Sequence, residues 1–485
     1  MTHLLTILPH GSTRAVPAGG NLLQALREAG CAPAAPCGGT GKCGKCTVLL
    51  DGVAVKACTV AVDRDMTVTV PKDPTLSVLT AGIHVPVSAP VSGCRLAFDI
   101  GTTTVAGVLL APDGRELGAA GTRNPQAPFG ADVVSRIRAA QEGHMDTLTA
   151  AIRACLTQMA LALCEKANIS PEEISLVSLV GNPAMQQLFL GISPKNLARP
   201  PFSPVLRRLE TVDAHPFLPC LPRARLLILP NISGFVGADT LGCMVALGMD
   251  TAEETTLLVD IGTNGEMVLG NRHGLISCST AAGPALEGAH IQHGMSAGPG
   301  AIDRVHIENG SLVCRVIGGG AAGGICGSGL ISAVAAALDL GLLNNRGKIL
   351  DASRQIPLAG GVSLSQEDIR QVQLAKGAVA AGIGLLVRRM GITPDAIGRV
   401  YLAGAFGSYL DPEAACRMGL LPREMAGRIE AVGNAALSGA RLLALDPTAR
   451  ERAQVMAAGT KALDLSAAPD FPKTFAQCMR FDTEL

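Results

Sequence analysis

The sequence predicts a small α+β domain at the N-terminus, then a connector and a large two-lobed α/β domain. Three observations lead to this division. Five of the fifteen cysteines lie between Cys31 and Cys58, prolines recur without periodicity over residues 71–94, and one hairpin motif occurs twice further on. A chain of 485 residues is also too long for one ordinary core.

The charge balance argues against two classes of partner. Forty Lys and Arg residues match forty Asp and Glu residues, so no net field gathers nucleic acid or an anionic membrane. The N-terminus lacks a signal-peptide pattern, and no window approaches the roughly 18 uncharged apolar residues of a membrane span. We therefore expect a cytoplasmic chain with no nucleic acid or membrane partner. Its cysteines are then expected to be metal ligands or buried thiols.

The first seventy residues read as strand, strand, helix, loop and hairpin. "THLLTIL" (2–8) and "TRAV" (13–16) predict two strands, and "NLLQALREAG" (21–30) predicts a helix with Asn21 as its N-cap. "CTVLLDGVAVKACTV" (46–60) predicts a hairpin around Asp51-Gly52, a pair favoured by type I′ turns. This hairpin brings Cys58 back toward Cys46.

Four cysteines then have the spacing of an iron-sulfur ligand set. They are Cys37, Cys43, Cys46 and Cys58, separated by five, two and eleven residues. Thiolates on one loop and one strand suit a 2Fe-2S cluster, and the glycines at 38, 39, 41 and 44 let backbone N–H groups face its sulfurs. The stretch resembles 2Fe-2S ferredoxin domains, which implies a ferredoxin-like (β-grasp) fold.

Two other interpretations of this stretch compete. A structural zinc site also uses four cysteines. A phosphate-binding P-loop is suggested from Gly39 onward, but Cys46 stands where that motif needs a hydroxyl for Mg²⁺, and no buried strand precedes the loop. Cys31 is expected to be a small buried side chain and not a fifth ligand.

The repeated motif is a hairpin with an aspartate at the end of its first strand. "LAFDIGTTTVAGVLL" (96–110) and "LLVDIGTNGEMVL" (257–269) coincide when Asp99 is laid on Asp260. The glycines let the turn approach a polyphosphate, and each aspartate can hold Mg²⁺ or orient a water molecule. We assign Asp99 and Asp260 as catalytic, and as ATP contacts Gly101, Thr102, Thr103, Thr104, Gly262, Thr263 and Asn264.

Two further glycine-rich segments are candidates for the rest of a nucleotide site. "VYLAGAFGSYL" (400–410) places Gly404 and Gly407 after a strand. "GGGAAGGICGSGL" (318–330) imitates a dinucleotide-binding fingerprint, but its helix is expected to begin only near Ser328. We therefore expect Gly327, Ser328 and Gly329 to present a helix N-terminus to the nucleotide.

The paired hairpins with the third loop resemble the superfamily of acetate and sugar kinases, heat-shock chaperone ATPases and actin. That resemblance implies that the first two motifs bind phosphates and that the third packs on adenosine. The superfamily usually has two adjacent glycines in the third loop, whereas this chain has Gly404-Ala405-Phe406-Gly407. The exact adenosine contacts therefore stay open.

The whole chain resembles the ATP-dependent reductive activators of corrinoid proteins. The segments that carry this resemblance are "APCGGTGKCGKC", "NPQAPFGADVVSRI", "LVGNPAMQQLFLG", "NISGFVGADTLG", "VDIGTNGEMVLG", "AAGPALEGAHIQHGMSAGPGAI", "GGICGSGLISAV" and "YLAGAFGSYLDP". The resemblance implies a 2Fe-2S cluster, ATP and Mg²⁺ as cofactors. It implies one-electron reduction of a corrinoid protein from Co(II) to Co(I), which rescues a methyltransferase system.

The resemblance also implies partners and leaves alternatives. A corrinoid methyl-carrier protein and an upstream electron donor are expected, and a homodimer is left open. The expected domains are a ferredoxin domain at 1–70, a linker at 71–94 that lets this domain move, and an actin-like ATPase domain at 95–485. The alternatives are a metabolite kinase and a chaperone-like ATPase, each with a redox-regulatory cluster.

Overall fold

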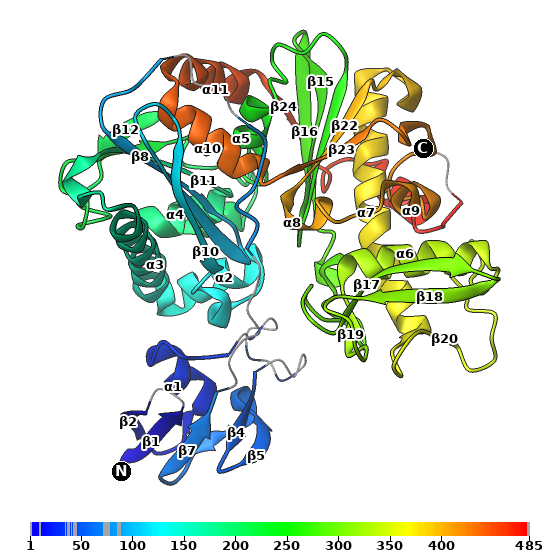
Figure 1. The fold of residues 1–485 in the computed structure, drawn as a ribbon, viewed down its shortest axis with the longest axis horizontal. Helices are drawn as coiled ribbons and strands as arrows, with labels where there is room; N and C mark the ends of the chain where they lie inside the picture. Colours follow the sequence, from blue (N-terminus) through cyan, green and yellow to red (C-terminus); the bar gives the residue numbers. More distant parts are fainter. Residues whose placement is uncertain are drawn as a thin grey trace.

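A computed structural model describes residues 2–8, 11–33, 35, 39, 41, 46–70, 78–84 and 89–482. Figure 1 shows a small N-terminal domain below two larger lobes that stand side by side. Cys37 and Cys43, two of the four expected cluster ligands, lie outside the described residues.

The N-terminal domain is a mixed sheet crossed by one helix. In spatial order its strands are β2 (Ser12–Pro17), β1 (Thr2–Leu8), β7 (Met66–Thr69), β4 (Thr47–Leu50) and β5 (Val53–Lys56), beside a short pair of β3 (Gly20–Asn21) and β6 (Ala61–Val62). The predicted helix is confirmed as α1 (Leu22–Glu28), whose N-cap Asn21 accepts a hydrogen bond from the Gln24 N–H. The predicted turn is confirmed too, because Asp51 and Gly52 both have positive φ, at 48° and 85°.

The first lobe is built on a six-stranded sheet. In spatial order the strands are β10 (Glu116–Arg123), β9 (Thr104–Leu110), β8 (Cys94–Ile100), β11 (Ile174–Gly181), β13 (Arg225–Ile228) and β12 (Glu210–Asp213). Its helices include α2 (Val133–Ala139), α3 (Met145–Ala167), α4 (Pro183–Leu190) and α5 (Ala238–Ala246). The strands β8 and β9 are almost fully buried, so this sheet is the centre of the lobe.

The second lobe has a six-stranded sheet of its own. In spatial order its strands are β23 (Ile429–Gly433), β22 (Arg399–Ala403), β14 (Thr256–Ile261), β15 (Gly265–Asn271), β16 (Gly274–Thr280) and β24 (Lys461–Leu463). A smaller sheet of β18 (Ser311–Val316), β17 (Ala301–Glu308) and β19 (Gly324–Ile325) packs with α6 (Gly327–Asp339), and β20 (Gln355–Pro357) pairs with β21 (Ser363–Ser365). The other helices of this lobe are α7 (Gln366–Met390), α8 (Gly404–Gly407), α9 (Pro412–Arg417) and α12 (Phe471–Cys478).

The two large sheets repeat one another over five strands. The order β10-β9-β8-β11-β13 in the first lobe matches β16-β15-β14-β22-β23 in the second. In both sheets the first three strands are antiparallel neighbours, and β11 and β22 run parallel to β8 and β14. The internal repeat seen in two hairpin sequences therefore extends to most of each sheet.

The C-terminal part of the chain ties the lobes together. After β23 the chain crosses back, and α10 (Ala435–Leu445) and α11 (Pro447–Gly459) lie over the first lobe, as the orange and red helices in Figure 1 show. There α10 packs against α5, β8 and β11. One apolar cluster contains Val108 from the first sheet and Leu258 from the second, so the lobes share buried core.

One helical stretch differs from the sequence expectation. Val133–Ala167 contains an apolar window, with a mean hydropathy of 1.4, that is long enough to cross a membrane. It comprises α2, a π-helical turn (Ala140–His144) and α3. The side chains of Leu148, Ile152 and Leu156 in α3 are fully buried, and α3 packs on β9, β10 and α4. Packing into the core accounts for this apolar character, so the window is weak evidence for a membrane span.

Residues 78–84 of the connector lie against the first lobe. A methyl group at Gly121 of β10 would overlap the Val78 side chain, and Gly82 forms an isolated antiparallel bridge with Gly433. The Asn434 N–H donates to the Ala81 carbonyl over 2.9 Å. This stretch is therefore held at the point where the chain passes from β23 to α10.

Candidate functional site

The first hairpin presents Asp99 and a tight glycine turn at the end of β8. Asp99 pairs across the hairpin with Ala106, and the turn at 101–103 follows directly. A methyl group at Gly101 would lie 2.8 Å from the Thr104 carbonyl oxygen, so only glycine fits there without strain. Thr103 is exposed, which leaves the turn accessible to a ligand.

The second hairpin presents Asp260 in the equivalent place. Asp260 pairs with Glu266 across the hairpin and with Ala403 on the parallel neighbour β22. Gly404 follows Ala403 with a φ of 82°, and a methyl group there would lie 2.5 Å from Asp260 Oδ1. The third glycine loop thus begins directly against the aspartate of the second hairpin.

The structure brings the two hairpin aspartates into one electrostatic environment. Burial, with added repulsion from Asp239 and Asp260, raises the pKa of Asp99 to about 7, and the hydrogen bond from Asn434 opposes this rise. Burial likewise raises the pKa of Asp260 to about 7, with added repulsion from Asp239 and Glu287. Asp99 and Asp260 therefore lie close enough for the charge of Asp260 to raise the pKa of Asp99, and their shared role at a nucleotide stays a prediction.

Three further carboxyl groups lie near these two aspartates, and the sequence pattern did not single them out. Burial raises the pKa of Asp239 to about 6 and that of Glu287 to about 7, and it raises the pKa of Glu266 well above its usual range. All three lie in glycine-rich segments, at "GADT", "ALEG" and "TNGE". An acidic residue in such a segment is a sequence signal for a site residue. The pattern alone does not say which of these acidic residues lie close together in the fold.

Clustered acids of this kind suit a bound cation. Burial makes each carboxyl group resist ionisation, acidic neighbours add to this at Asp99, Asp260 and Glu266, and a divalent cation relieves both effects. Among the described residues, no three acidic, histidine or thiol side chains could hold a metal ion by themselves. Mg²⁺ commonly uses one or two carboxylates together with water and phosphate oxygens, so this cluster of carboxyl groups fits Mg²⁺ brought by a nucleotide.

Side chains from three later positions in the sequence donate hydrogen bonds to the turn at 101–103. The Asn124 side chain donates to the Gly101 carbonyl over 2.8 Å, and the buried Arg136 guanidinium donates to the Thr102 carbonyl. Asn182, which caps α4, donates to the Thr102 hydroxyl over 3.0 Å. None of these residues was singled out from the sequence.

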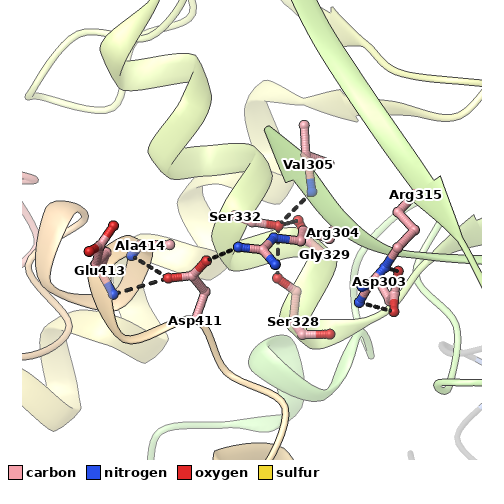
Figure 2. Close-up of polar contacts among 10 residues, drawn as sticks. All are labelled: Asp303, Arg304, Val305, Arg315, Ser328, Gly329, Ser332, Asp411, Glu413 and Ala414. Carbon is pink, nitrogen blue, oxygen red and sulfur yellow. Dashed lines mark hydrogen bonds and ion pairs between the residues drawn. The ribbon is translucent and has the colours of Figure 1, made fainter. Parts of the chain in front are cut away.

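The third group of predicted contacts lies at the start of α6. This helix begins at Gly327 with Cys326 as its N-cap, which agrees with a helix start near Ser328 and not at the earlier glycines. A methyl group at Gly329 would overlap the Ile302 carbonyl, so the helix start packs directly on β17. Figure 2 shows Ser328 beside Arg304 of β17, whose guanidinium forms a 3.2 Å ion pair with Asp411, the N-cap of α9.

The second loop and the third loop have contacts of their own. The Thr263 hydroxyl lies 3.4 Å from Glu287 Oε1, and the Gly262 N–H donates to the Asn264 carbonyl over 2.8 Å. Gly407 ends the single turn α8, where a methyl group would lie 3.1 Å from the Leu402 backbone. The 404–407 turn thus lies against β22 and beside Asp260.

Two of the four expected cluster ligands lie in the described part of the chain, and they meet. The sulfurs of Cys46 and Cys58 are 3.3 Å apart. Two thiolates that share one tetrahedral metal ion at about 2.3 Å would lie about 3.8 Å apart, so a small movement suffices. Gly39 and Gly41 have φ of 94° and 80°, and a methyl group at Gly39 would lie 3.7 Å from Cys58 Cβ. These residues fit a cluster bound close to the glycine loop.

Cys31 is half-buried and packs against the core of the N-terminal domain, so it is less enclosed than the sequence suggested. Its sulfur lies 3.7 Å from the Leu26 carbonyl oxygen, and burial raises the pKa of its thiol. A protonated thiol is a poor metal ligand. Cys31 is therefore a packing residue at the end of α1.

Three family models match the chain in succession. A 2Fe-2S iron-sulfur cluster binding domain matches residues 5–77, the RACo middle region matches residues 94–252, and the C-terminal ASKHA domain of RACo matches residues 254–484. These matches confirm the predicted fold classes, and they confirm a 2Fe-2S cluster and ATP as cofactors. ASKHA denotes the acetate and sugar kinase, heat-shock chaperone and actin superfamily, and Mg²⁺ is typical of its ATPases.

Two curated relatives and one solved structure are also similar. The chain is 36% identical over 354 residues to the corrinoid activation enzyme RamQ of Eubacterium limosum, which covers 66% of this chain and 59% of that protein. It is 33% identical over 220 residues to the [Co(II) methylated amine-specific corrinoid protein] reductase of Methanosarcina barkeri, covering 41% of this chain and 40% of that protein. The chain thus spans about three-fifths or less of the length of these relatives.

The solved structure is a reductive activator for corrinoid, iron-sulfur protein. The two folds superpose with a TM-score of 0.71 at 26% identity, over 99% of this chain and 98% of the other. The similarity therefore includes the N-terminal domain as well as both lobes.

Proposed function

This chain belongs to the family defined by the RACo middle and C-terminal ASKHA domains, and from that premise we propose that it is an ATP-dependent reductive activator of a corrinoid protein. In this proposal the protein delivers one electron to Co(II) of a corrinoid carrier and returns it to Co(I). The substrate is the corrinoid protein in its inactive Co(II) state. The names of the similar proteins support the choice of substrate class.

The redox energetics explain why such a reaction would use ATP. Plant-type 2Fe-2S centres have potentials near about −400 mV, and the Co(II)/Co(I) couple is expected to lie lower. For one electron, each 59 mV uphill costs about a tenfold loss in the equilibrium constant, or about 1.4 kcal/mol. Nucleotide-driven closure of the two lobes on the partner can supply this free energy by favouring a cobalt environment that is easier to reduce.

We assign the residues of the chain to two sites. Cys37, Cys43, Cys46 and Cys58 hold the 2Fe-2S cluster, which supplies one-electron chemistry when bound. The turns after Asp99 and Asp260 hold the phosphates of ATP from opposite lobes, and the two carboxylates manage Mg²⁺ and the attacking water. The remaining contacts proposed for ATP are Gly327, Ser328, Gly329, Gly404 and Gly407.

The observation that carries the proposal is that one chain contains two pairs of neighbouring side chains. One is a pair of cysteines, and the other is the pair of hairpin aspartates. The Cys46 and Cys58 sulfurs lie 3.3 Å apart, and burial together with neighbouring acids raises the pKa of both Asp99 and Asp260 to about 7. An electron carrier and a nucleotide clamp have no shared use in an ordinary kinase. We further propose a separate electron donor that reduces the chain, and action in the cytoplasm.

The proposal is tested anaerobically with a Co(II) corrinoid protein. The reduced, cluster-loaded protein is mixed with Mg-ATP and the corrinoid protein, and the Co(I) absorption band is followed. Cys58→Ser should abolish the band through loss of the cluster, and Asp260→Ala should abolish it with the cluster spectrum intact. Asp113→Ala, in the exposed turn after β9, is the matched control.

The outcomes separate the proposal from its rivals. A phosphorylated small molecule formed without any corrinoid protein would identify a metabolite kinase. Slow ATP hydrolysis with client release and no change at cobalt would identify a chaperone-like ATPase. Either result would replace the proposed function.

A further inference from the structure

One segment of the first lobe, residues 124–136, holds three successive carbonyl groups of the turn at 101–103. We call this turn the first phosphate turn. The Asn124 side chain donates to the Gly101 carbonyl over 2.8 Å, and the Asn124 N–H donates to the Thr103 carbonyl over 2.9 Å. Arg136, at the other end of the segment, donates to the Thr102 carbonyl. With its carbonyl side fixed, the turn can offer its opposite face to a phosphate group. The position of this turn therefore depends on the segment 124–136.

The segment is internally rigid. Arg136 Nε donates to the Gly130 carbonyl over 3.0 Å, and the Gln126 N–H donates to Asn124 Oδ1 over 2.9 Å. The Gln126 side chain donates to the Leu148 carbonyl over 3.0 Å, which fixes the segment to α3. The side chains of Asn124, Gln126 and Arg136 are fully buried. A displacement at one point of such a packed segment is transmitted along it.

The middle of this segment touches the cluster domain. Phe129 closes the short 3-10 helix η2 (Ala127–Phe129), and the Arg27 guanidinium of α1 lies 5.4 Å from the centre of its ring. Arg27 also borders the cluster loop, because a methyl group at Gly39 would lie 3.7 Å both from Arg27 Nη2 and from Cys58 Cβ. Arg27 is thus placed between the cluster loop and the first lobe.

The connector makes a second contact with the same site. Asn434 Nδ2 donates to the Leu79 carbonyl over 3.2 Å and to Asp99 Oδ2 over 3.0 Å. One amide group therefore touches both the connector and the aspartate of the first hairpin. The cluster domain is linked to the first phosphate turn by α1 on one side and by the connector on the other.

We propose that the contact between Arg27 and Phe129 is a docking interface for the cluster domain, and that the segment 124–136 couples this docking to ATP bound at the first phosphate turn. Asn124 and Arg136 are the positioning residues of that turn. The inference rests on the ATP site of the proposed function. It adds a means by which nucleotide and cluster domain affect one another within one chain.

The sign of the coupling follows from the docked arrangement. When the cluster domain is docked, Arg27 supports the segment 124–136, which holds the carbonyl groups of the first phosphate turn. Docking therefore favours the conformation of the turn that binds phosphate. Loss of the contact between Arg27 and Phe129 should weaken ATP binding. By thermodynamic reciprocity, ATP should strengthen the docking of the cluster domain by the same factor. The expected size is about threefold, which corresponds to one partly exposed cation–π contact.

The test uses the full, cluster-loaded protein under argon, with two readouts that need no turnover. ATP affinity is measured by nucleotide titration, and hydrogen exchange is followed in residues 22–33 with and without Mg-ATP. In the wild type, Mg-ATP should slow this exchange. Arg27→Gln and Phe129→Leu should weaken ATP binding about threefold and abolish the slowing, whereas Arg27→Lys and Phe129→Tyr should behave as the wild type.

Two matched controls locate the effect. Arg64→Gln removes an exposed cation that pairs with Asp51 elsewhere on the cluster domain. Phe217→Leu removes the ring that Arg153 covers at 5.0 Å, the same kind of contact but away from the phosphate turn. Both controls should keep wild-type ATP affinity and the ATP-dependent slowing. Thermal unfolding and the cluster spectrum report on folding, and Arg27→Gln alone decides the matter if Phe129→Leu does not fold.

The outcomes also distinguish this inference from the function on which it rests. If the wild type binds ATP but Arg27→Gln binds it equally well, the coupling is refuted and the ATP site stands. The coupling is likewise refuted, and the ATP site likewise kept, if exchange in residues 22–33 does not respond to Mg-ATP in a wild type that binds it. If the wild type binds no ATP, both the site and the coupling are refuted.

Discussion

Asp99 in the first lobe and Asp260 in the second end equivalent strands, but their neighbours differ in chemistry. Asp99 accepts a 3.0 Å hydrogen bond from the Asn434 amide. Asp239 repels the charges of both aspartates, whereas Glu287 adds to the repulsion at Asp260. The repeat thus conserves the position of the acid and changes its partners, so the two aspartates are expected to contribute unequally.

The strand that follows each hairpin shows the same contrast. Parallel to Asp99 and Ile100 run Val180 and Gly181 of β11, and Asn182 then caps α4 and reaches the Thr102 hydroxyl. Parallel to Asp260 runs Ala403, and Gly404 then turns directly against the carboxylate. The first lobe surrounds its turn with hydrogen-bond donors and contributes Asp239 from α5, whereas the second lobe brings Glu266, Glu287 and a glycine loop. We infer that the second lobe is the side on which the cation sits.

The largest expected effect is on ATP hydrolysis. Asp260→Ala should lower the ATPase rate by about 100-fold or more, because the carboxylate nearest the acidic neighbours is lost from the charge-stabilising set. Asp99→Ala should lower the ATPase rate less, since the neighbouring Asn434 amide remains. Steady-state phosphate release measures both variants, and Asp113→Ala should match the wild type. Equal losses for the two aspartates would remove the proposed asymmetry.

The next effect is on stability as a function of pH. The pKa of Asp260 is raised in the folded state from 3.8 to about 7, so its contribution is most favourable below pH 4 and is lost as the pH rises through 7. Asp260→Asn, without nucleotide or Mg²⁺, should therefore stabilise the protein relative to wild type more at pH 8 than at pH 5, by about 1–3 kcal/mol. Thermal or urea unfolding at the two pH values measures this. Asp113→Asn should show no such pH dependence.

A smaller effect is expected at the third loop. Gly404→Ala places a methyl group 2.5 Å from Asp260 Oδ1 at a φ of 82°, so strain of about 1–3 kcal/mol falls on the site. ATP affinity should fall about tenfold. Gly361→Ala is a matched control, because it has a similar φ of 80° with open space around it. If Gly404→Ala and Gly361→Ala bind ATP with the same affinity, strain in the third loop does not affect the ATP site.

The smallest effect is expected at the amide of the first lobe. Asn434→Ala removes the hydrogen bond to Asp99, whose net value is about 1 kcal/mol, together with those to the Leu79 carbonyl and from the Leu437 N–H. The ATPase rate should fall by less than about tenfold, and the optimum should move to higher pH because the carboxylate is harder to ionise. A pH profile of ATP hydrolysis measures both changes. A rate loss as large as that of Asp260→Ala would show that the first lobe is not the weaker side.

The sequence could predict the elements whose signals are local. The N-cap Asn21, the turn at Asp51-Gly52 and the paired hairpins depend on neighbouring residues, and the structure contains all of them. The start of α6 at Gly327 was also within reach, because glycines before it break the helical pattern. The family resemblance gave the cofactors and the superfamily of the large domain.

The surroundings of the site could not be predicted in the same way. Asn434 reaches Asp99 although 335 positions separate them, and Arg136 reaches Thr102 across 34 positions. No periodicity or spacing encodes such contacts, because they depend on how helices cross back onto the sheets. The connector illustrates this as well, since its prolines suggested free motion, whereas its residues 79–82 pack against Asn434 and Gly433.

The central claim is that ATP drives an electron from the cluster domain to cobalt against the potential difference. The most direct measurement is the Co(I) yield of a corrinoid protein held at a fixed potential of about −400 mV, with the wild-type protein present, before and after addition of Mg-ATP. We predict little Co(I) before ATP and a marked rise after it, with no rise for Asp260→Ala. An identical Co(I) yield with and without ATP would contradict the claim.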